Sequence, residues 1–222
     1  MVQVSASLLA ADFTRLGEQA RQAEAAGVDS FHFDMMDGHY VPNLAFAPDH
    51  LSALHAQTRL PFHAHLELNN PDSVLGNFRP FPADLIIVCL NTLPDPERTL
   101  ERIRSRQAQA GISLNPGESP ARVKSLLPML DLLLVLGVHP GFGGQPMQPD
   151  LPERVLQAAG LRQQLGLALP IAVDGGVNLD TAPALVEAGA DILIVGTALF
   201  HAPDMGVFVN NLKGCAAGPR YR

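Results

Sequence analysis

Hydrophobic positions along the chain form short runs that alternate with longer segments of helical periodicity. Buried strands are predicted at residues 3–8, 30–34, 62–66, 84–88, 111–114, 131–136, 171–173 and 191–195. Helices are predicted between and after them, at 13–25, 48–57, 72–77, 96–109, 120–127, 151–165, 181–188 and 205–212. Eight alternations without a linker or a shift in composition favour a closed (β/α)8 TIM barrel over an open doubly wound sheet. We therefore predict an α/β fold with a single domain over residues 1–222.

Local signals support several of these helix boundaries. Asp12 is suited to cap the first helix, and Gly27 follows its expected end. Gly189 is placed to close the helix at 181–188, with Asp180 near its start. The helix boundaries indicated by these four residues agree with those predicted from the hydrophobic pattern.

Composition excludes several classes of partner. The 222 residues carry a formal charge of −7 with only 15 lysines and arginines, which argues against a nucleic-acid surface. The two cysteines, Cys89 and Cys215, imply no disulfide framework. No signal-peptide pattern opens the sequence, and Pro128 and Asp131 interrupt the apolar stretch at 126–138, which is too short to span a bilayer. We expect a cytoplasmic protein without a membrane partner.

The lysines narrow the chemistry further. The chain has two of them, Lys124 in a helical pattern and Lys213 close to the C-terminus. Neither position is the end of a predicted strand, where a Schiff-base nucleophile or an Asp/Lys array would lie in a barrel. A lysine-dependent aldolase and a decarboxylase built on such an array are therefore not expected.

Ionisable side chains lie at three predicted strand ends. His32 and Asp34 are two residues apart and share one face of their strand, as do His63 and His65 on the next strand. Asp174 follows the seventh strand. Because a barrel gathers its strand ends around one axis, we expect these groups to converge.

Two imidazoles and two carboxylates form a mixed nitrogen and oxygen donor set. His32, Asp34, His65 and Asp174 would suit a divalent transition metal. A lone histidine is more often a structural residue, but four such groups at three strand ends favour a site. His63 stays open among three roles: a ligand, a residue that orients His65, or a core residue.

Glycines occupy the remaining strand ends. Backbone N–H groups of glycines approach anions closely, and the loops after the last two strands of a barrel commonly bind phosphate. Each cluster alone would be an ordinary tight turn, and a dinucleotide fingerprint fits poorly. The candidate phosphate-binding residues are Gly141, Phe142, Gly143, Gly144, Gly175, Gly176, Gly196 and Thr197.

A metal, two carboxylates and a phosphate site together indicate a class of reaction. A metal beside a sugar carbonyl and hydroxyl would stabilise an enediolate. Asp34 and Asp174 on opposite sides of one carbon would remove its proton and return it on the other face. The sequence thus favours an epimerase of phosphorylated sugars.

Several strings resemble the ribulose-phosphate 3-epimerase family, and the similarity covers nearly the whole chain. They are Ser-Leu-Leu-Ala-Ala-Asp-Phe at 7–13, Asp-Met-Met-Asp-Gly-His-Tyr-Val-Pro-Asn-Leu at 34–44, Leu-Asn-Pro at 114–116, Pro-Gly-Phe-Gly-Gly-Gln at 140–145 and Val-Asp-Gly-Gly-Val-Asn at 173–178. The second and fourth are highly specific. The resemblance implies interconversion of D-ribulose 5-phosphate and D-xylulose 5-phosphate, with Asp34 as proton acceptor and Asp174 as donor, in the pentose phosphate pathway.

The resemblance also implies roles for the other site residues. It makes His32, Asp34, His65 and Asp174 the ligands of one divalent ion, which is zinc, iron, manganese or cobalt in such enzymes. Ser7 and His65 would contact the sugar, Met36 would line the apolar floor, and the glycine loops would hold the phosphate. A homo-oligomer is expected on the same ground.

Departures from the family pattern gather at the sugar end of the expected pocket. Glu67 stands where the family usually has methionine, Cys89 and Asn91 where it commonly has histidine and glutamate, Leu136 where methionine is expected, and His63 where aspartate is usual. Glu67 would add a third carboxylate near the metal, and Cys89 is either a buried apolar residue or a thiolate ligand. Two alternatives therefore stay open: an epimerase of another ketose phosphate, such as a ketohexose 6-phosphate, and a phosphosugar-binding barrel with little turnover.

Overall fold

The strands close into the predicted barrel. In the computed structural model, which describes residues 1–75 and 85–215, each barrel strand pairs in parallel with its neighbours, and β1 pairs with both β9 and β2. The barrel strands are β1 Gln3–Ser7, β2 Ser30–Asp37, β4 Phe62–Glu67, β5 Leu85–Cys89, β6 Gln109–Leu114, β7 Leu132–Leu136, β8 Ile171–Asp174 and β9 Ile192–Val195. The (β/α)8 fold is therefore confirmed.

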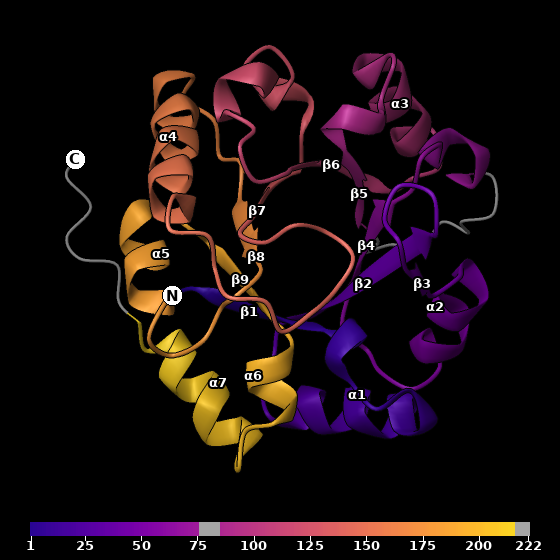
Figure 1. The fold of residues 1–222 in the computed structure, drawn as a ribbon, viewed down its shortest axis with the longest axis vertical. Helices are drawn as coiled ribbons and strands as arrows, with labels where there is room; N and C mark the ends of the chain where they lie inside the picture. Colours follow the sequence, from indigo (N-terminus) through magenta and orange to yellow (C-terminus); the bar gives the residue numbers. More distant parts are fainter. Residues whose placement is uncertain (76–84, 216–222) are drawn as a thin grey trace.

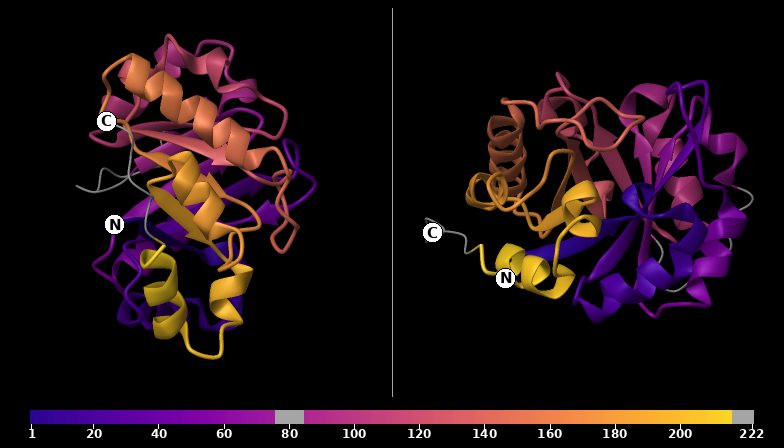
Figure 2. Two further views of the ribbon diagram at one scale, coloured as in Figure 1. Left: turned by 90° about the vertical axis from the view of Figure 1, so that its left-hand side faces the viewer. Right: turned by 60° about the horizontal axis from the view of Figure 1, so that its bottom comes forward.

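Helices surround the strands on all sides of the barrel (Figures 1 and 2). They are α1 Leu16–Ala25, α2 Pro48–His55, α3 Pro96–Arg104, α4 Leu151–Gln164, α5 Ala182–Ala188, α6 Thr197–Phe200 and α7 Met205–Lys213. Asp12 accepts a hydrogen bond from Thr14 N at the start of the short 3-10 turn that precedes α1, and Gly189 ends α5 at φ 112°. In the described ranges, none of the helices has the length and apolar character needed to cross a membrane.

Strand β2 extends beyond its predicted end at residue 34. It runs to Asp37 because it continues to pair with β4, Met36 opposite Glu67. A short strand, β3 (Leu44–Ala45), also pairs with it in the antiparallel sense. Strand β2 thus continues past His32 and Asp34 and leads into the loop that follows Asp37.

Four predicted helices differ from the structure. The first, at 13–25, begins as a 3-10 turn, Phe13–Arg15, and is α-helical only from Leu16. Helix α3 ends at Arg104 because Gln107 takes a positive φ of 63° and β6 begins at Gln109. The segment 120–127 forms two 3-10 turns, Pro120–Val123 and Leu127–Met129, because the two prolines leave too few residues for an α-helical nucleus.

The predicted helix at 72–77 is the fourth difference. A 3-10 turn, Pro71–Ser73, occupies its first part, and Asn77 lies outside the described residues. Asp84, the first residue of the predicted strand at 84–88, lies outside them too. The short helix α6 was not predicted, because four residues after β9 carry too little periodicity.

The barrel interior has a polar half and an apolar half. Alternation along β2 turns His32 and Asp34 inward, while Phe31 and Phe33 join the core between strands and helices. The inward side chains of β5, β7, β8 and β9 form a separate apolar cluster of Leu85, Ile87, Leu132, Leu134, Leu136, Ala172, Ile192 and Ile194. Strands β1, β2 and β4 therefore carry most of the polar groups that face the barrel axis.

Candidate active site

A cavity of about 280 Å³ opens at the carboxyl ends of the strands. The segment between β7 and α4 crosses this end of the barrel (Figure 1). Most of the predicted site residues line the cavity: Ser7, Asp34, Met36, Glu67, Leu136, Gly141, Phe142, Gly143, Gly144, Asp174, Gly175, Gly176, Gly196 and Thr197. His32, His65 and Cys89 are not among its lining residues and are fully buried. The barrel thus brings together groups from strands β1, β2, β4, β7, β8 and β9.

Asp34 lies at the centre of the polar groups. Its Oδ1 is 3.0 Å from His32 Nε2 and 3.1 Å from His65 Nδ1, and Ser7 Oγ donates a hydrogen bond of 3.2 Å to its Oδ2. Burial opposes ionisation of this carboxyl, but the nearby imidazoles of His32 and His65 outweigh it and hold the pKa of Asp34 well below its ordinary value. Asp34 is therefore ionised at neutral pH.

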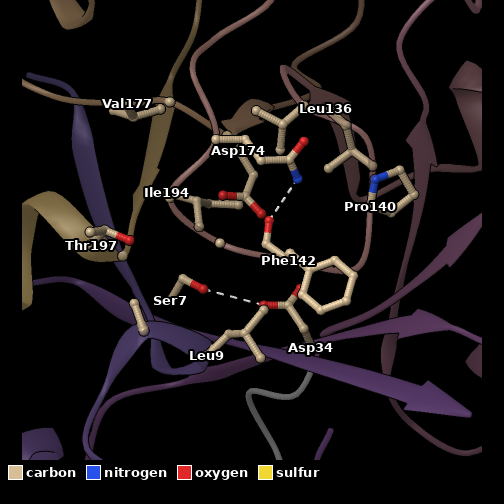
Figure 3. Close-up of a pocket in the computed structure, with 18 of the residues that line it drawn as sticks. Ser7, Leu9, Asp34, Leu136, Pro140, Phe142, Asp174, Val177, Ile194 and Thr197 are labelled. Carbon is tan, nitrogen blue, oxygen red and sulfur yellow. Dashed lines mark hydrogen bonds between the residues drawn. The ribbon is translucent and has the colours of Figure 1, made fainter. Parts of the chain in front are cut away.

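Asp174 approaches the cavity from another side (Figure 3). Its Oδ2 is 3.8 Å from His32 Nε2, and its side chain is 22% exposed, against 4% for Asp34. Burial and the nearby charge of Asp34 raise the pKa of Asp174 to about 6, although His32 acts in the opposite direction. The two carboxyls thus differ in their affinity for a proton.

Three of the four predicted metal ligands form one group. His32, Asp34 and His65 each offer a donor atom, and these atoms lie within 4.8 Å of one another. Asp174 lies outside this group and reaches it through His32. The ring of His32 is completely buried: its Nε2 faces the carboxylates of Asp34 and Asp174, and its Nδ1 makes no hydrogen bond to any residue of the described ranges. A buried imidazole nitrogen that faces two carboxylates fits a divalent ion.

A residue that the sequence analysis did not single out holds His65. Ser113 Oγ, on β6, is 2.9 Å from His65 Nε2, and Cys89 Sγ on β5 is 3.6 Å from the same nitrogen. These contacts leave Nδ1 facing Asp34.

Burial and the nearby His32 lower the pKa of His63 to about 4, so His63 is a neutral residue below the site.

Glu67 places a third carboxylate in the cavity wall. The residue is only 4% exposed, and its Oε1 is 3.6 Å from His65 Nδ1. Its Oε2 makes no hydrogen bond within the described part of the chain. Burial, together with the charges of Asp34 and Asp174, raises the pKa of Glu67 to about 9. This part of the cavity is therefore more acidic in composition than two aspartates alone would make it.

The glycine loops meet at the other end of the cavity. Gly175 and Gly176 have φ values of 106° and 70°, and a Cβ atom on Gly176 would lie 2.4 Å from Met147 N. Only glycine fits so close a backbone approach with a positive φ. Thr197, at the start of α6, borders the same space (Figure 3). The residues predicted to hold a phosphate are thus adjacent in space.

Asp37 fixes the loop above the site. Its carboxylate accepts hydrogen bonds from the backbone N–H groups of His39, Tyr40 and Asn69, at 2.8–2.9 Å. The Tyr40 hydroxyl then donates to Asn91 Oδ1 at 2.9 Å. Asp37 therefore has a structural role.

The fold and the site define a class of protein: a (β/α)8-barrel enzyme with carboxylates and imidazoles gathered at the carboxyl ends of its strands. The model of the ribulose-phosphate 3 epimerase family matches residues 3–200, and the chain belongs to that family. It is 35% identical to ribulose-phosphate 3-epimerase of Bacillus subtilis, over 96% of this chain and 99% of that protein. Identity to ribulose-phosphate 3-epimerase of Methanocaldococcus jannaschii is 36%, over 97% and 92% of the two chains. The predicted enzyme class, an isomerase, is confirmed.

A solved structure shows the same fold at low identity. KGPDC from Streptococcus mutans superposes with a TM-score of 0.68, covers 97% of both chains and is 12% identical. This likeness supports the barrel architecture alone. The family resemblance predicted from the sequence strings is confirmed by the family model and the curated relatives, and it does not depend on this likeness of fold.

Proposed function

We propose that the protein interconverts D-ribulose 5-phosphate and D-xylulose 5-phosphate by moving the proton on C3 through an enediolate. The observation that carries the proposal is the placement of Asp34 and Asp174 at one cavity, each within 3.8 Å of His32 Nε2. Two carboxylates on opposite faces of one carbon are the minimal equipment for inverting it by proton transfer. The names of the curated relatives support the same reaction.

Asp34 is the proton acceptor in the forward direction, and Asp174 is the donor. Two carboxyl groups in different environments are suited to opposite roles, one as base and one as acid. The hydrogen bond from Ser7 and the contact with His65 hold Asp34 in place on its strand. Asp174 is more open to the cavity, which lets it exchange its proton with a bound sugar.

One divalent ion held by His32, Asp34, His65 and Asp174 would supply Lewis acidity toward the negative charge that develops on the sugar oxygens. Zinc, iron, manganese and cobalt all accept this set of imidazole and carboxylate donors. The position of His32 Nε2 between the carboxylates of Asp34 and Asp174 supports the assignment. Ser113, by its contact with Nε2 of His65, keeps Nδ1 of that ring directed at the same position.

The phosphate group of the substrate binds at the glycine loops. Backbone N–H groups near Gly143, Gly144, Gly175, Gly176 and Gly196, with the Thr197 hydroxyl, would bind its oxygens without a lysine or arginine. Ser7, which lines the cavity, would contact the sugar, while the fully buried His65 acts through its contact with Asp34, and Met36 lines the floor beside the reacting carbon. The cavity of about 280 Å³ accommodates a five-carbon sugar phosphate at the lower end of known ligand sites.

The proposal is tested by incubating metal-loaded protein with D-ribulose 5-phosphate in D2O and following the products by NMR. Deuterium at C3 together with xylulose 5-phosphate is the expected result. Asp34→Asn and Asp174→Asn should each abolish epimerisation, because one face of the carbon loses its proton carrier. A chelator should abolish turnover, and added divalent ion should restore it. Near-normal turnover of either variant with metal bound would overturn the mechanism of two carboxylates.

A second candidate function is the epimerisation of another ketose phosphate. Glu67, Cys89 and Leu136 all lie at or beside the sugar end of the cavity, where they would alter the contacts of the sugar hydroxyls. Comparing turnover of ketopentose and ketohexose phosphates separates the two candidates. Binding of both without exchange of the proton would favour a phosphosugar-binding protein with little turnover.

A further inference from the structure

The carboxylate of Glu67 is the least explained polar group of the cavity. It is almost fully buried on β4, it lines the cavity, and its Oε2 has no hydrogen-bond partner among residues 1–75 and 85–215. An unsatisfied buried carboxylate oxygen is costly in a folded protein. Its persistence here points to a group that binds it and that the protein chain does not itself provide.

Contacts with His65 narrow the nature of that group. His65 Nδ1 lies 3.1 Å from Asp34 Oδ1 and 3.6 Å from Glu67 Oε1. One ring nitrogen carries at most one proton, so it can satisfy only one of the two carboxylates; a backbone hydrogen bond from Gly141 also reaches Glu67, but its Oε2 has no partner in the described ranges. The opposite nitrogen, Nε2, already faces Ser113. A cation between these groups would satisfy both carboxylates and the lone pair of Nδ1 together.

Three donor atoms, from His32, Asp34 and His65, lie within 4.8 Å of one another, and Glu67, like Asp174, lies outside this group and contacts it through one imidazole. An arc of contacts runs from Asp174 through His32, Asp34 and His65 to Glu67, with successive distances of 3.8, 3.0, 3.1 and 3.6 Å. Neighbouring ligands of an octahedral ion with bonds of about 2.1 Å are about 3 Å apart. Glu67 ends the arc as Asp174 begins it, at a comparable distance from the nearest imidazole.

We propose that Glu67 is a fifth protein ligand of the divalent ion, which gives this chain a centre of three carboxylates and two imidazoles. Carboxylate oxygens favour harder ions, so the extra ligand shifts the preference of the site from Zn²⁺ toward Mn²⁺. The inference rests on the ion of the proposed function and adds a ligand to it. It also accounts for a third carboxyl group buried beside Asp34, because a cation would offset the cost of burying its ionised form.

The test measures metal affinity and not turnover. Metal-free wild type, Glu67→Gln and Glu67→Met are titrated with Mn²⁺, read by the EPR signal of the free ion, and with Zn²⁺ in competition with a chelator. We expect Glu67→Gln to weaken Mn²⁺ binding at least about 100-fold, since even an outer-sphere partner costs about 10–100-fold, and to weaken Zn²⁺ binding less. Glu187→Gln, which removes an exposed carboxylate on α5, is the matched control and should bind both ions like the wild type.

The remaining outcomes are equally decisive. Glu67→Met replaces the carboxylate by an apolar side chain of similar length, so it keeps the test valid if the glutamine variant fails to fold. Unchanged Mn²⁺ affinity in a folded Glu67 variant overturns the proposal. If Asp34→Asn loses the ion while Glu67→Gln retains it, only the fifth ligand is wrong. If wild type binds neither ion, the metal of the proposed function is wrong as well.

Discussion

Arg154 joins three parts of the barrel rim through one side chain. It lies on α4, is 5% exposed, and its guanidinium donates to the carbonyl oxygens of Leu136 at 2.8 Å and Asn115 at 2.6 Å. Longer bonds of 3.3 Å reach the carbonyls of Leu114 and Glu118. These carbonyls belong to the ends of β6 and β7 and to the loop after β6. We predict that Arg154→Met destabilises the protein by loosening this rim.

The magnitude follows from the bonds that are lost. A hydrogen bond to a charged group contributes about 1.5–3 kcal/mol net. The lower end of this range applies to Arg154. Burial of its guanidinium is costly, as its lowered pKa shows, and the methionine variant does not pay this desolvation cost. Counting only the two short bonds gives about 3 kcal/mol. For a chain of this size that loss corresponds to a fall in Tm of about 6–12 °C.

Urea unfolding followed by circular dichroism measures this loss directly. The control is Arg122→Met, because Arg122 also lies beside Glu118 but is 54% exposed and forms a surface ion pair with it. Such a pair contributes less than about 1 kcal/mol, so the control should unfold almost like the wild type. If Arg154→Met and Arg122→Met lost equal stability, the interpretation of Arg154 as a buried clamp would be refuted.

Three further predictions concern single side chains of the site and its rim. Gly176→Ala should weaken the binding of small phosphate esters, measured by calorimetry, by at least about tenfold, because strain of about 1–3 kcal/mol must be relieved by shifting the backbone at Met147. The control is Gly160→Ala in α4, where a Cβ meets nothing within 4 Å, and it should bind the esters like the wild type. In the folded protein, backbone N–H groups lower the pKa of Asp37, although burial opposes them. Asp37→Asn should therefore be less stable than wild type at pH values above the ordinary pKa of 3.8, and this difference in stability should vanish in acid unfolding experiments below the folded pKa. Ser113→Ala should reduce metal affinity about 10–100-fold in chelator competition, since Nε2 of His65 loses its partner, and unchanged affinity would count against an orienting role.

Much of the barrel could be predicted from the sequence because its strands are buried on both faces. Continuous apolar runs such as 131–136 and 191–195 identify strands without knowledge of their neighbours. The missed features depend on those neighbours. The end of β2 at Asp37 is set by pairing with β4 and β3, and the end of α3 by the start of β6. Such boundaries are consequences of the assembled sheet.

The candidate site divides in the same way. His32, Asp34, His65 and Asp174 could be selected because ionisable residues at strand ends are conspicuous in an apolar sequence. Ser113 could not be, since a single serine in β6 has no local signal of its own. Its contact with His65 arises because β4 and β6 both turn side chains toward the same axis, although β5 lies between them.

The contact between His32 and Asp174 has a consequence for assembly. Strands β2 and β8 are not neighbours, and they are held at their mutual distance by β1 and β9, which come from opposite ends of the chain. A ligand that needs both side chains can therefore bind only after β1 has paired with β9. By mass action, such a ligand stabilises the closed sheet over any intermediate in which this pairing has not formed. Ligand affinity would therefore report on the closure of the barrel, and an ion bound by both side chains would hold β2 and β8 together across the β1–β9 pairing.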